Sequence, residues 1–212
     1  SIKKELCKEW FLKKHYARRL PNICYSFGLY KLNNLVGVLS YGVGGNSNIN
    51  KINDYKMIEL NRLVTNENLD KNSLSYFVSQ TIKMMPPNII IISYADENKN
   101  HHGYIYQATN FIYTGLSSKE NIFIIDNKEI HRKTFYERHG TSSEKKLLEI
   151  YKDELKIIKG KPKYRYLYLK LNKKDKKKIK KVWQYKEYDY PKGKNIRYDA
   201  NYNPLIQTEL FL

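Results

Sequence analysis

The amino-acid sequence predicts a mixed α/β protein, in which a central β-sheet is flanked by helices and followed by a basic C-terminal extension. Segments with helical spacing alternate along the chain with short β-branched runs. Of these runs, Asn88–Ser93 (NIIIIS) is the most continuous and is typical of a buried central strand. A length of 212 residues is enough to bury a full core, and it leaves room for an appendage beyond one α/β unit.

Spacing and turn residues predict the elements in chain order. Lys3–Tyr16 has helical spacing, and the two segments after it alternate as strands around Asn33-Asn34, a hairpin signal. A later helix begins at Ser73 and is capped by Ser73 or Asn72. The elements predicted after the first helix are strands at Ile23–Leu32, Leu35–Tyr41 and Lys56–Val64, a helix at Ser73–Met84, the strand at Asn88–Ser93, a helix at Tyr104–Asn110 and a strand from Phe111–Tyr113.

Composition narrows the class of protein. Two cysteines cannot build a disulfide framework, and they suggest a reducing compartment. No apolar run reaches membrane-spanning length, and the first residues (SIKKELCKEW) lack the apolar core of a signal peptide. The loop Gly42–Asp54 contains glycines but does not lead into a helix, so it is a weak candidate for phosphate binding. These features agree with an enzyme of one compact domain.

The chain is strongly basic. It carries 39 Lys and Arg against 21 Asp and Glu, a formal net charge of +18 with a pI of about 9.6. Such a charge raises the local concentration of polyanions. An AT-biased genome would explain Lys in preference to Arg, but not the imbalance with Asp and Glu. No amphipathic basic helix suits a membrane face, so nucleic acid is the predicted polyanion.

The charge is densest in Lys173–Lys181 (KKDKKKIKK), which holds seven lysines in nine residues. The centre of this run supplies candidate DNA contacts, namely Lys176, Lys177 and Lys178. In KYRYLYLKL just upstream, period two places three rings on one strand face, where they could stack on bases: Tyr164, Tyr166 and Tyr168. The alternative is a solvated helix packed on a tyrosine-rich sheet, and both interpretations stay open.

A carboxylate and a tyrosine follow the predicted central strand, within Ser93–Gly115 (SYADENKNHHGYIYQATNFIYTG). Asp96 lies just past the C-terminal end of that strand, where open α/β sheets place their chemistry. Tyr106 follows ten residues later on a short helix, so the two are candidates for acid–base catalysis. His101-His102 lie between them, and because adjacent histidines on a turn diverge, at most one is expected to be functional.

The spacing of Tyr106 and Phe111, Tyr-x-x-x-x-Phe, resembles the helix-to-strand passage of GNAT acyltransferases, in which such a tyrosine is the usual general acid. The whole phrase resembles the bacteriophage Mom-like family, GNAT-like enzymes that add a carbamoylmethyl group to the exocyclic amine of adenine in DNA. The resemblance extends from about His15 to Pro191. It implies a mixed, centrally splayed sheet, a catalytic domain at residues 1–171 and a basic, tyrosine-rich extension at residues 172–212 packed on it.

One segment departs from the GNAT pattern. Where those enzymes carry a glycine-rich turn for the pyrophosphate of coenzyme A, this chain has Thr65–Ser75 (TNENLDKNSLS), without glycine and with Glu67 and Asp70. The helix start at Ser75 can still bind an anion of the substrate. The acidic side chains before this helix disfavour the binding of acyl-coenzyme A, so the group donor is unknown. Mom-like proteins share this kind of departure.

An arginine interrupts an apolar face of the predicted strand IELNRLVT. Period two places Leu60, Arg62 and Val64 on one face, with Asn61 on the other. An arginine in such a place requires a carboxylate or phosphate partner. Arg62 is therefore predicted to bind substrate, with Asn61 beside it, or to pair with Asp96; a structural ion pair at the sheet edge is the alternative.

His15 and Tyr16, with Arg19 behind them, resemble the positions that end the first helix in Mom-like proteins. The resemblance implies that His15 and Tyr16 join Asp96 and Tyr106 as catalytic residues on the acceptor side, with Arg19 contacting substrate. A histidine there could accept a proton from the adenine amine or bind a metal. The resemblance implies iron, with His15 and Asp96 as candidate ligands.

The segment His131–Ser143 (HRKTFYERHGTSS) also resembles Mom-like proteins. Its basic side chains are predicted to hold phosphates or a flipped nucleotide, and they include His131, Arg132 and Arg138. The hydroxyl run Thr141-Ser142-Ser143 could instead cap a helix that begins near Glu144.

The leading hypothesis is a DNA-adenine-modifying enzyme that protects phage DNA from host restriction in the cytoplasm of the infected bacterium. Its expected partners are double-stranded DNA and a small-molecule group donor, with no membrane. One alternative is a conventional GNAT acetyltransferase that uses acetyl-coenzyme A on a small amine, protein or tRNA-linked substrate. Another is an inactive DNA-binding protein on a GNAT scaffold. The oligomeric state is open, a homodimer being one option.

Overall fold

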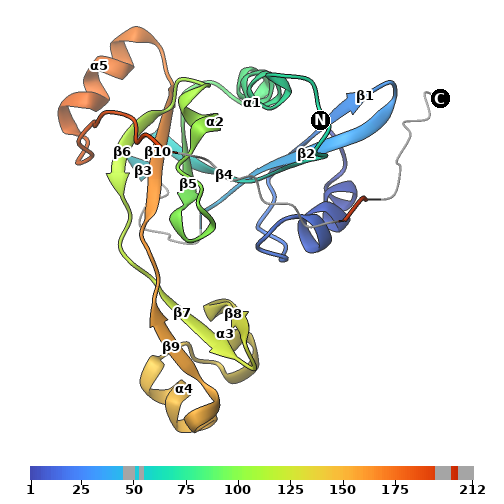
Figure 1. Cartoon of the computed structure of the whole chain (residues 1–212). Coiled ribbons are helices and arrows are strands. Elements are labelled where there is room, and N and C mark those ends of the chain that lie inside the picture. The colour runs from blue at the N-terminus through green and yellow to red at the C-terminus, as the bar shows by residue number, and fades with distance from the viewer. Residues whose placement is uncertain (45–50, 53–54, 194–201, 205–212) are drawn as a thin grey trace.

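A computed structural model describes residues 1–44, 51–52, 55–193 and 202–204. It consists of a main body around one large sheet and a small lobe that extends from it (Figure 1). The large sheet has seven strands in the order β1-β2-β4-β5-β10-β6, with β3 added to β4. Its strands are β1 (Tyr25–Lys31), β2 (Asn34–Gly42), β3 (Lys51–Ile52), β4 (Tyr55–Thr65), β5 (Ile89–Asp96), β6 (Ile112–Leu116) and β10 (Lys163–Lys170).

The sheet is mixed, because β4 and β5 run parallel while its other strand pairs are antiparallel. Helices cover both faces. Helices α1 (Ser73–Met84) and α2 (Tyr104–Gln107) pack on one face, where Phe77 and Val78 meet Ile91. Helix α5 (Lys173–Val182) packs on the other face through Ile179. The predicted fold class, a mixed sheet flanked by helices, is therefore confirmed.

The N-terminal segment is helical but not a regular α-helix. It contains the 3-10 helix η1 (Lys4–Cys7) and the π-helix η2 (Trp10–Lys14), and a further short helix, η4 (Glu97–Lys99), follows β5. Trp10 and Phe11 are buried against β2 and β4. No helix in the described ranges is long and apolar enough to cross a membrane.

The predicted order of elements is confirmed, with differences at two turns. The hairpin turn is Leu32-Asn33, whose φ angles of 49° and 63° fit a two-residue primed turn, so Asn34 already belongs to β2. Asn72 precedes α1, but no side-chain capping hydrogen bond forms there. Instead the Ser73 hydroxyl donates to the Asp70 carbonyl at 2.7 Å, so the predicted cap is wrong. Most of the predicted loop at 42–54 lies outside the described residues.

The lobe, residues 117–162, is a unit that sequence reasoning did not foresee. It inserts between β6 and β10 and contains a three-stranded sheet in the order β8-β7-β9. A core of its own joins Phe123 to Phe135, Leu147 and Leu155. Its elements are β7 (Asn121–Ile125), β8 (Lys128–Ile130), α3 (Arg132–His139), α4 (Glu144–Tyr151), η5 (Lys152–Glu154) and β9 (Lys156–Lys159).

The described part of the C-terminal extension packs on the main body. After α5, the chain returns along β6, where the Tyr188 N–H donates to the Tyr113 carbonyl at 3.0 Å. The Tyr190 hydroxyl donates to the Phe111 carbonyl at 2.6 Å. Residues 202–204 lie by the N-terminal helices, and Lys14 donates to the Tyr202 carbonyl at 2.7 Å. The extension thus contacts the molecule at two distant places.

The separate core of the lobe leads to a stability prediction. Phe135 is fully buried there, so Phe135→Ala should destabilise the lobe by about 3–5 kcal/mol. Hydrogen exchange should then show lost protection across residues 121–159, while β4 and β5 remain protected. Tyr136→Ala, at a neighbouring exposed position, is the control. Equal loss of protection in β4 and β5 would contradict an independent lobe.

Candidate functional site

The sheet opens between β4 and β5. Their parallel pairing runs from Lys56 and Ile89 to Glu59 and Ile92, and no further. Beyond that point β4 continues against β2, while β5 continues against β10 as far as Asp96. The splayed centre expected from the resemblance is therefore present, and it forms an opening in the middle of the sheet.

A β-bulge at Asn61 shapes one wall of this opening. In β2, Ser40 lies opposite Arg62 and Tyr41 opposite Leu60, which leaves Asn61 without a partner residue. The Ser40 hydroxyl donates to Asn61 Oδ1 at 2.6 Å, and Asn61 Nδ2 donates to the Asn22 carbonyl at 2.8 Å. Both polar groups of this side chain therefore hold the bulge.

The bulge changes the faces of β4. Leu60 lies in the core beneath α1 with Leu63 packed against that core, whereas Val64 lies in the N-terminal core. The prediction that Leu60, Arg62 and Val64 share a face is wrong, because the extra residue at Asn61 shifts the alternation by one.

Arg62 lines the opening with incomplete pairing. Its Nη1 donates to the Asn61 carbonyl at 2.6 Å, while its Nε is buried without a hydrogen-bond partner. Burial, followed by the charge of Arg19, lowers the pKa of Arg62, and Glu59 opposes this shift. Among the described residues no ion pair joins Arg62 to Asp96, so that predicted pairing does not form. A guanidinium in this state is suited to bind an anionic group.

His15 ends η2 and points its ring into the same region. Its side chain is buried, and its Nδ1 accepts a hydrogen bond from the Ala17 N–H at 3.0 Å. The neutral ring therefore carries its proton on Nε2. Burial, followed by the charges of Arg62, His101 and Arg19, lowers the pKa of His15 well below 6.5. This geometry favours a hydrogen-bond donor at Nε2 over the predicted proton acceptor.

Tyr16 stands between His15 and the end of β5. Its ring centroid is 4.3 Å from that of His15 and 5.8 Å from that of His101. Burial raises the pKa of Tyr16, and the charges of Asp96 and Tyr106 raise it further. The Tyr16 hydroxyl therefore stays protonated, within reach of the electrostatic influence of both predicted catalytic groups.

Asp96 is held at the end of β5. Its Oδ1 accepts from the Asn98 N–H at 2.9 Å and from Asn98 Nδ2 at 3.1 Å. The His101 N–H donates to the Asp96 carbonyl at 3.1 Å, which turns the histidine back toward Tyr16. His101 Nε2 is buried without a hydrogen-bond partner, so this histidine of the predicted pair belongs to the site.

Tyr106 completes the far wall from α2. Its ring packs on Phe111 and Tyr166, with centroid distances of 5.3 Å and 5.2 Å. Ser93 influences the Tyr106 hydroxyl, and the Ser93 hydroxyl itself donates to the Leu60 carbonyl at 2.8 Å. Burial raises the pKa of Tyr106, which keeps the hydroxyl protonated.

Two residues of the site were missed from the sequence. Ser93 ends the apolar run NIIIIS and Glu59 stands between Ile58 and Leu60, so a polar side chain in an apolar strand was the available signal. Burial raises the pKa of Glu59, and the charge of Arg62 opposes this shift.

The lobe reaches the edge of the opening. Arg19 Nη1 lies 3.4 Å from His131 Nδ1, and Lys99 pairs with Glu129 at 3.6 Å. His131 also caps α3, because its Nδ1 accepts from the Lys133 N–H at 3.1 Å. Burial and the charge of Arg19 lower the pKa of His131 to about 4, in keeping with a neutral acceptor. Arg19 and His131, which were predicted as site residues in separate segments of the sequence, are thus in contact.

The other predicted residues of the lobe lie further along α3. Arg132 donates to the Ser142 carbonyl at 3.2 Å and pairs with Glu144 at 3.6 Å, while Arg138 is exposed near the end of α3. Ser143 precedes α4 without a side-chain capping hydrogen bond; its N–H donates to Thr141 Oγ1 at 3.2 Å.

The lysine helix lies at the opposite end of the sheet from Asp96. In β10, Lys163 pairs with Asp96 and Lys170 with Ile89, and α5 begins after Lys170. A strand of this length separates its ends by roughly 25 Å. The exposed predicted contacts on α5 are Lys176, Lys177 and Lys178.

The tyrosine face of β10 is turned into the core. Tyr166 is fully buried, and its hydroxyl donates to the His102 carbonyl. Tyr164 and Tyr168 pack beside it, against Tyr113 and Phe111. The interpretation of this face as a stacking platform for bases is therefore wrong, because apolar neighbours occupy it.

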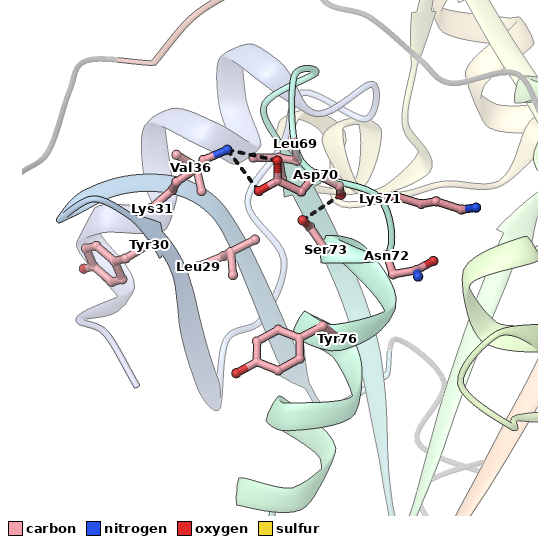
Figure 2. A pocket seen from close by; sticks show the side chains of 10 residues that line it. All are labelled: Leu29, Tyr30, Lys31, Val36, Leu69, Asp70, Lys71, Asn72, Ser73 and Tyr76. Carbon is pink, nitrogen blue, oxygen red and sulfur yellow. Dashed lines mark hydrogen bonds and ion pairs between the residues drawn. The ribbon is translucent and has the colours of Figure 1, made fainter.

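Ser75 lies in the first turn of α1, where its hydroxyl donates to the Asn72 carbonyl at 2.9 Å. Beside the start of α1, a groove of about 390 Å³ separates this helix from the β1–β2 hairpin (Figure 2). Asp70 lies in this groove and pairs with Lys31 at 3.0 Å. Because a carboxylate occupies the approach to the helix start, the groove is poorly suited to a pyrophosphate.

Iron at His15 and Asp96 stays a prediction, because two side chains leave most positions of a metal ion to other ligands. Among the described residues, no three His, Cys, Asp or Glu side chains are grouped so that they could hold a metal ion. The Nε2 proton of His15 would also have to leave before that nitrogen could coordinate.

The fold and the opening define a class: an α/β protein whose splayed sheet holds a carboxylate, protonated tyrosines and an incompletely paired arginine. The chain belongs to the Mom protein family, whose sequence model matches residues 1–192. The methylcarbamoylase Mom of Escherichia phage Mu is 31% identical over 137 residues, which cover 60% of this chain and 51% of that protein. The chain thus spans about half the length of this curated relative.

Among solved structures, one match is an acetyltransferase of Bacillus subtilis in complex with CoA. Its sequence identity is 13%, the TM-score is 0.33, and the match covers 77% of this chain and 82% of that one.

The buried neutral histidine makes stability depend on pH. The folded protein holds His15 neutral, while the unfolded chain binds a proton near pH 6.5. The free energy of unfolding should therefore fall as pH drops from 6.5 toward 5. In His15→Asn the amide oxygen can still accept from the Ala17 N–H without titrating. Urea unfolding at pH 7 and pH 5 should show a smaller loss for this variant than for wild type, and equal losses would contradict the assignment.

Proposed function

We propose that this protein is a DNA-modifying transferase that adds a carbamoylmethyl-type group to the exocyclic amine of adenine. The observation that carries the proposal is the gathering of Asp96, Tyr106 and Arg62 around one opening, in a chain that belongs to the Mom family. The name of the phage Mu relative, a methylcarbamoylase, supports the type of group. The net charge of +18 supports DNA as the substrate.

The properties of the acceptor, the adenine amine, determine what the enzyme must do. The adenine amine is a weak nucleophile, because its lone pair is delocalised into the ring, and it is stacked inside the duplex. The enzyme must therefore extrude the base and remove a proton as the new nitrogen–carbon bond forms. Asp96, anchored through one oxygen by Asn98, is the proton acceptor in this proposal.

The donor side needs a hydrogen-bond donor and a cation. As the new bond forms, the bond between the transferred carbon and its leaving group breaks, and the leaving group takes the electron pair. The protonated Tyr106 hydroxyl would stabilise that charge, and Arg62 would hold an anionic part of the donor. The donor is a small molecule that carries the carbamoylmethyl carbon.

The biological role follows from the product. Methylene-linked amide groups on adenine would alter the major-groove edge that restriction enzymes read. We infer that the modification protects phage DNA during infection, in the cytoplasm of the bacterial host.

Substitution of the two reacting groups tests the proposal. Asp96→Asn keeps the shape and the contact with Asn98 but removes the base, and Tyr106→Phe removes one hydroxyl. Each should lower modification by about a hundredfold or more. DNA affinity and folding should stay near the wild-type values. The measurement is mass analysis of nucleosides from DNA of cells that express each variant.

Matched controls are available for both variants. Glu97→Gln changes a neighbouring carboxylate that pairs with Lys161, and Tyr104→Phe changes an exposed tyrosine on α2. Both should modify adenine normally. Full activity of the Asp96 and Tyr106 variants would refute the assigned roles, and unmodified adenine with wild-type protein would refute the function.

The lysine helix is predicted to add distant phosphate contacts. Replacing Lys176, Lys177 and Lys178 with glutamine should weaken DNA binding. It should also lower the salt dependence of binding, because fewer phosphate contacts release fewer counterions. Replacing Lys3, Lys4 and Lys8, also exposed, is the control for net charge. Fluorescence anisotropy at several salt concentrations provides the slopes. If both triple variants have the same slope, α5 is not a specific contact.

A further inference from the structure

The sheet of the lobe has one covered and one uncovered face. Helices α3 and α4 cover the face that carries Phe123, Ile125 and Ile157. The uncovered face carries Ile122, Ile124 and Ile158, and none of the three packs against a core formed by the described residues. We call these three residues the isoleucine face.

The isoleucine face is contiguous. Ile122 lies directly opposite Ile158 across β7 and β9, and Ile124 follows two residues along β7 on the same side. Ile158 is 48% exposed, and the other two are half-buried. Adjacent, partly exposed apolar side chains on one face of a sheet offer a surface on which an apolar group can pack.

The isoleucine face borders the candidate active site. Glu129 pairs with Ile124 across β7 and β8, so its side chain lies on the same face. Glu129 forms an ion pair with Lys99, which lies three residues after Asp96. Arg19 of the main body also contacts His131 of the lobe. Two contacts thus connect the lobe with the main body near the end of β5.

Cationic side chains border these isoleucines, together with the carboxylate of Glu129. Lys156 lies opposite Ile124 in β9 and is exposed on the same face. Lys161 follows β9 and pairs with Glu97 at 3.7 Å, beside Asp96, and Arg19 approaches from the main body. An apolar surface with a cationic rim fits a nucleic-acid strand, whose bases are apolar and whose phosphates are anionic. A second copy of this chain, with the same net charge of +18, would be repelled.

We propose that the isoleucine face supports the DNA strand at the place where the target adenine is extruded. This inference rests on the proposed function. The base next to the extruded adenine loses a stacking neighbour, and Ile122, Ile124 and Ile158 replace that neighbour with apolar contact. Lys156 and Arg19 meet the adjacent phosphates.

A comparison of paired and unpaired DNA tests this inference. One probe is a DNA duplex of mixed sequence, and the other has the same sequence with three central base pairs unpaired around an adenine. Because unpaired bases are already unstacked, the wild-type protein should bind the second probe more tightly. Ile122→Ser with Ile158→Ser should lower affinity for the unpaired probe by about tenfold and leave duplex affinity unchanged.

The control variant combines Leu148→Ser with Ile150→Ser, at two exposed apolar positions of α4. It should keep the preference for unpaired DNA. Circular dichroism and hydrogen exchange of the lobe confirm that each variant is folded. Sedimentation of the wild-type protein and the Ile122/Ile158 variant shows whether they differ in oligomeric state.

Two outcomes overturn the inference alone, while wild-type protein still modifies adenine. One is an Ile122/Ile158 variant that keeps the full preference for unpaired DNA. The other is a wild-type dimer that this variant converts to monomers, which would assign the isoleucine face to self-association. A wild-type protein that binds neither probe would overturn both this inference and the proposed function.

Discussion

The bulge at Asn61 is the constraint on which the site depends. Its side chain bonds Ser40 on β2 and the backbone of Asn22, so an unpaired residue is fixed in β4 at the point where pairing with β5 stops. The extra residue exchanges the two faces of β4 for the residues that follow it. Arg62 therefore lies near Tyr16 and Tyr106, whose charges influence its pKa, and not in the apolar core.

Several titratable side chains at the opening between β4 and β5 are neutral. Burial together with the charges of Arg62 and Arg19 holds His15 neutral, and burial keeps the hydroxyls of Tyr16 and Tyr106 protonated. The site thus combines several neutral hydrogen-bond donors with the anchored carboxylate of Asp96. Such a set can remove one proton and stabilise developing negative charge without large rearrangement. The lobe adds a surface beside this chemistry rather than a reacting group.

Local pattern sufficed to predict the elements and their order, because period and turn residues are read from neighbouring positions. The same pattern placed Tyr106 on α2, and it placed Asp96 just past the central strand, whereas β5 extends three residues beyond Ser93 and ends with Asp96 itself. It could not predict the bulge, since Asn61 depends on partners 21 and 39 residues away. It did not separate the lobe either, because an apolar run such as NIFIID does not specify which sheet it joins. The donor role of His15 arises from one contact with Ala17, and period two could not tell whether Tyr166 faces solvent or core.

The position of the target base is the central claim, and photo-crosslinking measures it directly. DNA that carries 8-azidoadenine in unpaired positions would be irradiated in complex with the protein, and the attached peptides would be identified by mass spectrometry. The account predicts attachment to peptides that contain Tyr16, His101 or Tyr106, which border the opening between β4 and β5. Attachment confined to α5, or to the groove at Tyr76 beside α1, would contradict it.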